Sequence, residues 1–267
     1  MPLRATILAT NDNIKELISS EIQEYGHACD LNHLDVSEVT SLNGVFAGSK
    51  FNGDISKWDT SNVKTMNKMF AKSRFNGDIS KWNVGHVEDF GAMFEKSMFN
   101  SDISEWKTNN AVTFYKMFYD TDFNGDLSKW DVRSVEHFGS MFELSAFNGN
   151  LDSWVLTNAV TIERMFYLSS FRHDVSHWSL ALSVHMLHVA DPSLLDSWEI
   201  TPWVLKAHIE SGSTPSDSLW QQLLKTTQIA EKALGNGFTT KERAELAFAM
   251  WETNYRGRFE NATLSPS

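Results

Sequence analysis

Carboxylates recur every 24 residues along the chain, and they are the first side chains to consider for chemistry. The series consists of Asp54, Asp78, Asp102, Asp126 and Asp174, with Asn150 in place of an acid in one unit. Stacked carboxylates at glycine-containing turns are typical of calcium-binding repeats. Each turn here supplies only one carboxylate, whereas Ca²⁺ takes about six to eight oxygen ligands. The pattern therefore favours a structural role, in which each Asp accepts backbone N–H bonds in its own turn.

Amide side chains follow the same interval two positions earlier. The series consists of Asn52, Asn76, Asn100, Asn124 and Asn148. An amide at a repeated turn can bond the backbone of the adjacent unit and satisfy groups that the turn leaves open. We predict this structural role for the whole series.

The remaining reactive side chains do not form a catalytic or metal-binding set. His173 and His177 are four residues apart, and His185 and His188 are three apart, but no cysteine or convergent acid completes a zinc site. Cys29 is the single cysteine, so no intramolecular disulfide can form. The sequence contains neither a nucleophile-elbow motif nor a phosphate-binding glycine loop. We therefore predict that the protein is not an enzyme and has no catalytic residues, metal or cofactor.

Large apolar residues recur with the same 24-residue period, and this is the strongest signal in the sequence. Phenylalanine occupies Phe51, Phe75, Phe99, Phe123, Phe147 and Phe171. Tryptophan occupies Trp58, Trp82, Trp106, Trp130, Trp154 and Trp178. A Met-Phe pair recurs in the same phase, beginning with Met69-Phe70. A unit of this length cannot bury such side chains alone, so neighbouring units must stack and bury them as structural ladders.

The pattern within one unit predicts its local structure. Asn52-Gly53-Asp54 is a turn signal, and Ile55–Asp59 is short enough to be an extended strand. From Asn62 the apolar residues have helical spacing up to Met69-Phe70. We therefore expect an α/β repeat solenoid of 24-residue coils, with short parallel strands and short helices.

The unit resembles a known repeat family. The segment Phe51–Asp59, followed by Asn62-Val63 and Met69-Phe70, is similar to the BspA-like leucine-rich repeats, in the version known as the Mycoplasma lipoprotein-associated repeat. The resemblance covers residues 12–190. It implies a leucine-rich-repeat-like solenoid that acts in protein–protein contact. Many relatives are bacterial surface proteins or adhesins, and others occur in phages and mobile elements.

Three regions follow from these signals. Residues 1–26 are expected to form an N-terminal helical cap, and residues 27–194 the BspA-like repeat solenoid. The phase decays after Trp178, and residues 195–267 are expected to be helical, with candidate helix starts at Thr201, Ser216 or Asp217, and Thr239 or Thr240. This last region is either a cap on the final coil or a small effector domain.

The net charge and the distribution of apolar residues indicate which classes of partner and which cellular location to expect. The net charge is −11, so nucleic acid is an unfavourable partner and a basic protein fits the sign better. No segment reaches the roughly 18 apolar residues of a membrane span, and the N-terminus lacks a secretory pattern. We expect a cytoplasmic protein that does not enter a membrane; oligomeric state is left open.

The expected function is a scaffold that binds another protein through the solenoid surface, of the kind found in phage or mobile-element interactors. The alternatives are an effector whose C-terminal part acts on a target chosen by the repeats, and a surface adhesin. Certain slots vary between units, among them the two that follow each Trp and those of Asn67 and Lys68. Solvent-facing rows vary in this way through recognition or drift. We predict partner-binding residues where tyrosines occupy such slots, at Tyr115, Tyr119 and Tyr167.

Overall fold

The computed structural model divides into two compact units, Met1–Asp191 and Pro192–Ser267. The described residues are 4–181, 183–195, 197, 204 and 207. Of the second unit they include the short helix α2, Pro192–Leu195. The helices expected to start at Thr201, at Ser216 or Asp217, and at Thr239 or Thr240 lie outside the described residues. Among the residues that are described, no helix is long and apolar enough to cross a membrane.

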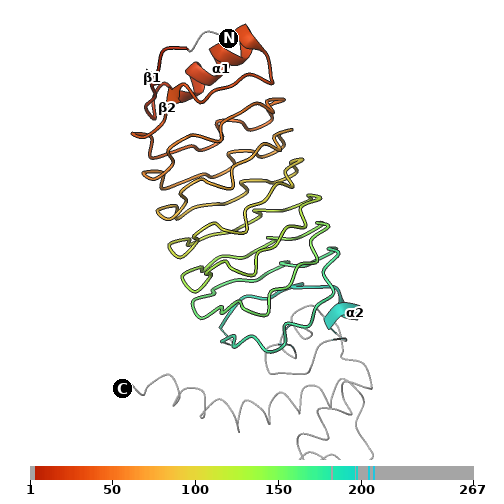
Figure 1. Ribbon diagram of the computed structural model, residues 1–267. Coiled ribbons are helices and arrows are strands. Elements are labelled where there is room, and N and C mark those ends of the chain that lie inside the picture. Colours follow the sequence, from red (N-terminus) through yellow and green to blue (C-terminus); the bar gives the residue numbers. More distant parts are fainter. Residues whose placement is uncertain (1–3, 182, 196, 198–203, 205–206, 208–267) are drawn as a thin grey trace, which may run out of the picture. The chain divides into compact units, whose positions relative to one another are not determined.

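The first unit begins with a short strand and a helix and then continues as a stack of coils (Figure 1). Strand β1, Ile7–Leu8, pairs in parallel with β2, Leu34–Asp35. Between them lies helix α1, Ile14–Tyr25, which buries Ile14 and Ile18. The helix ends at Gly26, whose positive φ of 86° suits glycine at the end of a helix. An N-terminal helix thus precedes the first coil.

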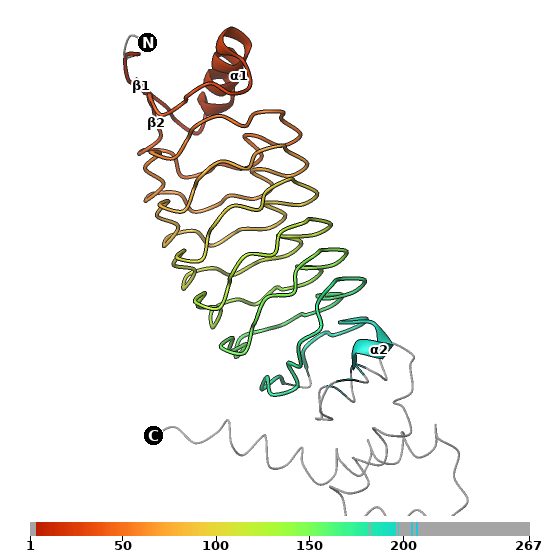
Figure 2. The ribbon, with the colours of Figure 1, turned by 45° about the vertical axis from the view of Figure 1, so that its right-hand side comes forward.

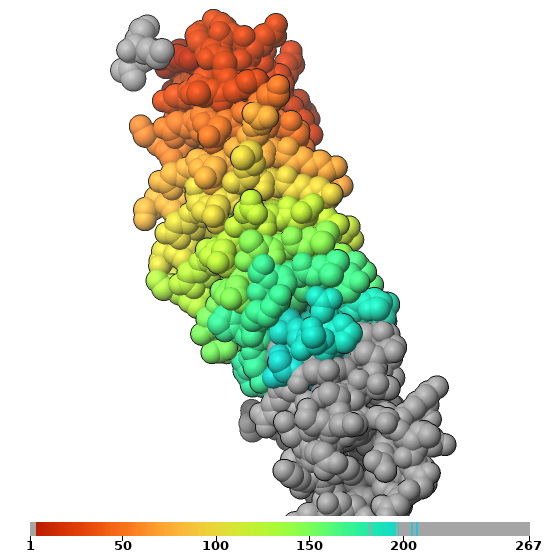
Figure 3. All heavy atoms as spheres, turned by 90° about the vertical axis from the view of Figure 1, so that its right-hand side faces the viewer, coloured from red at the N-terminus to blue at the C-terminus, as the bar shows by residue number. Residues whose placement is uncertain are grey.

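Successive coils lie one above another at the 24-residue interval (Figure 2). One residue of each coil forms a parallel bridge to its equivalent in the next, through the series Ser41, Thr65, Asp89, Thr113, His137, Thr161 and His185. Side chains fill the spaces between the coils (Figure 3). Because each coil meets only its neighbours, the core consists of continuous columns of side chains.

The aromatic columns form as the spacing predicts. Phe51 and Phe75 have ring centroids 6.1 Å apart with nearly parallel planes, and Trp106 and Trp130 are 6.2 Å apart. All six phenylalanines of the first series are fully buried, and the six tryptophans are 2–4% exposed. Full burial of one large apolar side chain is worth roughly 1.5–3 kcal/mol. The repeated aromatic residues are therefore explained by the core of the stack.

The short helix expected in each coil is absent from the described residues, and this expectation was wrong. The segment 67–72 instead forms consecutive turns, in which the N–H of Met69 bonds the Met66 carbonyl and that of Ala71 bonds the Lys68 carbonyl. Lys68 and Lys72 have positive φ angles of 56° and 58°. A right-handed helix cannot contain such residues, because they reverse its backbone geometry.

The same turns recur in every coil, and their backbone groups bond the next coil instead of their own. The N–H groups of Lys68, Phe70 and Lys72 donate to the carbonyls of Gly91, Met93 and Glu95. These bonds take the N–H groups that a helix would direct to the carbonyl four residues earlier. We call this side of the stack the turn edge. It comprises the turns at 43–48, 67–72, 91–96, 115–120, 139–144 and 163–168.

The short strand expected at Ile55–Asp59 is also absent. The N–H of Trp58 bonds the Ile55 carbonyl and closes a turn, whereas the bridges between coils lie at Asp54 and at Thr65. The carboxylate of Asp54 stabilises this turn by accepting from the N–H of Ser56. We call this second side the Asx edge; it comprises residues 54–58 and their equivalents at intervals of 24.

Candidate functional site

The polar side chains of the Asx edge form hydrogen bonds with the backbone of the same edge. Asp78 accepts from the N–H of Ser80 at 2.9 Å, and Asp126 accepts from that of Ser128 at 2.8 Å. These bonds, with a further one from each serine hydroxyl, lower the pKa of both carboxyls. Asn150, which replaces the acid in one coil, accepts from the N–H of Asp152 in the same way. The structural role predicted for this series is confirmed.

The asparagine series connects neighbouring coils. The side-chain oxygen of Asn52 accepts from the N–H of Asn76 at 2.8 Å, and that of Asn76 accepts from the N–H of Asn100 at 2.7 Å. The same bond repeats up to Arg172, whose N–H donates to Asn148. The predicted role in bonding adjacent coils is confirmed. Within the described residues no group of three or more His, Cys, Asp or Glu side chains is arranged to hold a metal ion.

The indole N–H groups complete the Asx edge. The Nε1 of Trp82 donates to the Ile55 carbonyl, and that of Trp106 donates to the Ile79 carbonyl, each at 3.1 Å. Every indole from Trp58 to Trp154 bonds the coil before it in this way. A buried indole usually needs such a partner. The most regular side chains of the repeat therefore hold the stack together and leave few groups for binding.

One row that was expected to face solvent is instead buried. In five coils the second slot after Trp holds Thr60, Val84, Thr108, Val132 and Leu156, all 1–3% exposed, whereas Leu180 in the sixth is half-buried. The hydroxyls of Thr60 and Thr108 donate to the carbonyls of Asn83 and Asp131 in the next coil. Variation in this row reflects exchange between residues of similar size in the core. The first slot after Trp does face solvent in most coils, as Lys107 and Val155 show.

The three predicted tyrosines all lie on the turn edge, and the structure brings two of them together. The ammonium of Lys116 lies 5.3 Å from the ring centre of Tyr115 and 5.1 Å from that of Tyr119. Lys96 of the preceding coil lies 5.5 Å from the Tyr119 ring. Lysine ammonium groups at such distances are attracted to the ring faces. Tyr115 is 47% exposed, whereas Tyr119 is half-buried.

Tyr167 lies two coils further along and has its own cation. The guanidinium of Arg164 is 4.3 Å from the Tyr167 ring centre, and the His188 ring is 5.7 Å from it. Arg164 also donates at 3.0 Å to Glu143, which is only 4% exposed. Burial raises the pKa of Glu143, but bonds from Arg164 and Ser140 outweigh this effect and leave the pKa lowered.

Large and small residues alternate from coil to coil on the turn edge, a feature that the 24-residue period alone does not reveal. One slot holds Asn67, Gly91, Tyr115, Gly139 and Glu163, and the next holds Lys68, Ala92, Lys116, Ser140 and Arg164. A side chain at Gly139 would approach the Tyr115 ring to 3.3 Å, and one at Gly91 would meet the Asn67 amide at 2.7 Å. The larger residue of one coil therefore lies over the smaller residue of the next. The sequence signal was a second period of 48 residues.

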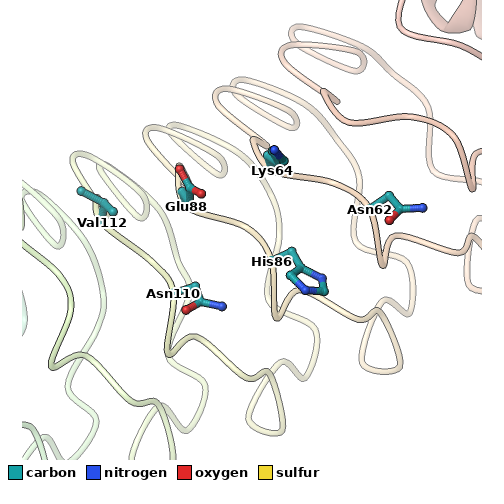
Figure 4. A pocket seen from close by; sticks show the side chains of 6 residues that line it. All are labelled: Asn62, Lys64, His86, Glu88, Asn110 and Val112. Atoms are coloured by element: carbon teal, nitrogen blue, oxygen red, sulfur yellow. The ribbon is translucent and has the colours of Figure 1, made fainter.

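A separate depression lies on the face where the coils form their bridges. Its volume is about 500 Å³, and six side chains from three successive coils line it: Asn62, Lys64, His86, Glu88, Asn110 and Val112. Figure 4 shows these side chains in two parallel rows. Asn62, His86 and Asn110 each bond a carbonyl of the preceding coil. Much of the polar lining thus already stabilises the stack.

Comparison with known protein families gives a match to the first unit of the chain. The family model described as "Mycoplasma protein of unknown function, DUF285" matches residues 15–122 and 99–191. The chain belongs to this family. Together the two matches cover the helix α1 and the stack of coils, which is about two thirds of the sequence. No curated protein and no solved structure matches the chain.

Proposed function

We propose that the stack of coils is a protein-interaction scaffold of the BspA-like leucine-rich-repeat type, and that it binds another protein through the turn edge. The observation that supports this function is the contrast between the two edges. The repeated side chains of the Asx edge bond the backbone of their own stack. The turn edge instead presents side chains that differ from coil to coil and are not required by the repeat.

Tyr115 is the clearest of these side chains. It is 47% exposed in a slot where other coils have Asn, Gly or Glu, so the coil itself does not require an aromatic ring. Tyrosine is enriched among the residues that dominate binding energy at protein interfaces. Together with Tyr119 and Lys116 it forms a preformed contact surface on one coil.

The test replaces the three tyrosines with residues that sister coils already contain. The variant Tyr115→Asn, Tyr119→Glu, Tyr167→Glu should stay folded, because Asn67, Glu95 and Glu143 occupy the equivalent slots. We expect it to lose the binding partner that the unaltered chain retains from an extract of the native host. Loss of even one interface hot spot, worth about 2 kcal/mol or more, weakens binding roughly thirtyfold.

A control variant changes exposed residues of the Asx edge. Glu105→Ala with Lys129→Ala removes an exposed ion pair, and it should leave partner binding unchanged. If the tyrosine variant is folded and binds the same partner with unaltered affinity, the turn edge is not the binding surface. If both variants lose the partner, binding is not confined to one edge.

A further inference from the structure

Five cations gather at or beside the N-terminal end of the turn edge: Lys68, Lys72 and Lys96 lie in its turns, and Lys50 and Arg74 each lie two residues after a turn. All five are exposed. We call this cluster the basic patch. The turn edge of these three coils and of the next one carries two carboxylates, Glu95 and Asp120. The patch is therefore positive within a chain whose net charge is −11.

Backbone bonds place these cations side by side. The N–H of Arg74 donates at 3.0 Å to the carbonyl of Ser49, the residue before Lys50. The N–H of Lys72 donates at 2.6 Å to the carbonyl of Glu95, the residue before Lys96. Lys72 and Arg74 are separated only by the buried Ser73, so both side chains project outward from the same short segment. The cluster thus spans three adjacent coils.

The cations of the patch are largely unpaired. Lys96 lies 3.5 Å from Asp120, whereas the other four form no ion pair with any part of the chain that the structure describes. On the Asx edge the cations are instead interleaved with the repeated acids, as Lys81 and Lys129 are with Asp78, Asp102 and Asp126. Screening by salt limits such fields to about 8–10 Å, so a local excess of one sign matters more at the surface than the net charge does.

We propose that the basic patch binds a short acidic segment of a partner polypeptide. The proposal rests on the scaffold function proposed above and names the chemistry of its partner. Coils about 4.8 Å apart give a patch roughly 10 Å long across three coils, which matches three or four residues of extended chain at about 3.3 Å each. Carboxylates of Glu or Asp in such a segment are complementary to the ammonium and guanidinium groups.

Two observations favour a peptide over nucleic acid or a membrane surface. Met98, which is 66% exposed, follows Arg74 in the same row and offers an apolar contact that a phosphate backbone does not use. Asp120 and Asp122 bound the patch on the next coil. A duplex or a bilayer is wider than the patch and would meet these acids, whereas a short segment can end before them.

The experiment measures binding of a fluorescent acidic peptide of about four glutamates, the length that the patch accommodates, to the full chain by anisotropy, at low and at physiological ionic strength. We expect binding that weakens with salt. The double variant Lys72→Glu, Arg74→Glu should weaken it at least tenfold. The control Lys57→Glu, Lys81→Glu changes the net charge equally but lies on the Asx edge, and it should change the affinity less than threefold.

Every other outcome counts against the patch. Equal weakening by both double variants would mean that the peptide senses only net charge. Absence of binding, or tighter binding to duplex DNA or to vesicles containing anionic lipid, would exclude an acidic peptide as the preferred ligand. Circular dichroism establishes that both variants remain folded. Since the probe is synthetic, a negative result leaves the tyrosine test of the scaffold function intact.

Discussion

The Asx edge and the turn edge repeat with the same period but obey different constraints. On the Asx edge the turn-forming and buried positions keep the same task from coil to coil, as the indoles from Trp58 to Trp154 do by bonding a carbonyl of the coil before. On the turn edge the backbone repeats, with positive φ at Lys68, Ala92 and Lys116, while the side chains do not. A stack can therefore fix its backbone on both edges while the side chains of one edge vary more than those of the other.

The largest expected difference between the edges is in stability. Trp106→Ala removes a side chain that is 2% exposed and stacked on Trp130, so it should lower the free energy of unfolding by about 3–5 kcal/mol. Tyr115→Ala removes an aromatic side chain that is 47% exposed on the turn edge, and it should cost about 1 kcal/mol or less. Urea unfolding of the two variants measures the contrast.

A comparable loss in both variants would contradict this division. It would mean that Tyr115 acts as part of the core by covering Gly139, and the turn edge would then have a structural task at this coil.

The second prediction concerns the backbone of the turn edge. Lys72 has a φ of 58° and an exposed side chain, and Gly48 occupies the same slot one coil earlier. Lys72→Val should destabilise the protein by about 1–2 kcal/mol, because in the left-handed conformation the second methyl group of a β-branched residue crowds the backbone more than the unbranched lysine does. Lys72→Gly should change stability by about 0.5 kcal/mol or less, since relief of strain and loss of chain entropy offset each other.

Lys107→Val is the matched control for this change. Lys107 is exposed on the Asx side of its coil, and Val155 already occupies the same slot two coils later. The melting temperature of the Lys107→Val variant should stay close to that of the unaltered chain. If Lys107→Val and Lys72→Val lower it equally, the cause is β-branching on the surface and not the left-handed backbone.

The sequence predicted the ladders well, because each depends on one residue type at one interval. Burial of Phe51 and Trp58, the turn bond of Asp54 and the inter-coil bond of Asn52 all followed from spacing. The short helices did not follow, since apolar residues at Met66, Met69 and Phe70 fit inward-facing turns as well as a helix. Nothing in the identity of Lys68 signals a positive φ, because lysine has no preference for that conformation.

The sequence predicted the proposed binding surface less well than it predicted the core. Variation alone did not separate the buried slot of Thr60 from the slot that holds the exposed Lys68, because both vary from coil to coil. Thr60 and Val84 differ in polarity but have similar shapes, and the hydroxyl finds a carbonyl in the next coil. The 48-residue alternation was readable, but its meaning depends on which residues of neighbouring coils touch.

The smallest expected effect concerns the Asx edge and is measured through the titration of the Asp78 carboxyl. Hydrogen bonds from the N–H and hydroxyl of Ser80 lower the pKa of Asp78 in the folded protein. Its contribution to stability is therefore fully present above the unfolded pKa of about 3.9, and it is lost as the pH falls through the lower folded pKa. Asp78→Asn should keep the turn, as Asn150 does, and should change stability at pH 7 by about 0.5 kcal/mol or less.

The informative quantity is the slope of stability against pH below about pH 4. Asp78→Asn should make the decline shallower, because one group that binds a proton on unfolding has been removed. Asn150→Asp should not show the reverse change, because its carboxylate would accept the N–H of Asp152 but would also face the Asp152 carboxylate, to which the Asn150 amide now donates at 3.2 Å. Urea unfolding at a series of pH values gives both slopes. An Asp78→Asn curve that runs parallel to that of the unaltered chain would mean that the turn bond does not favour the ionised carboxyl, and the Asx edge would then owe its acids to solubility alone.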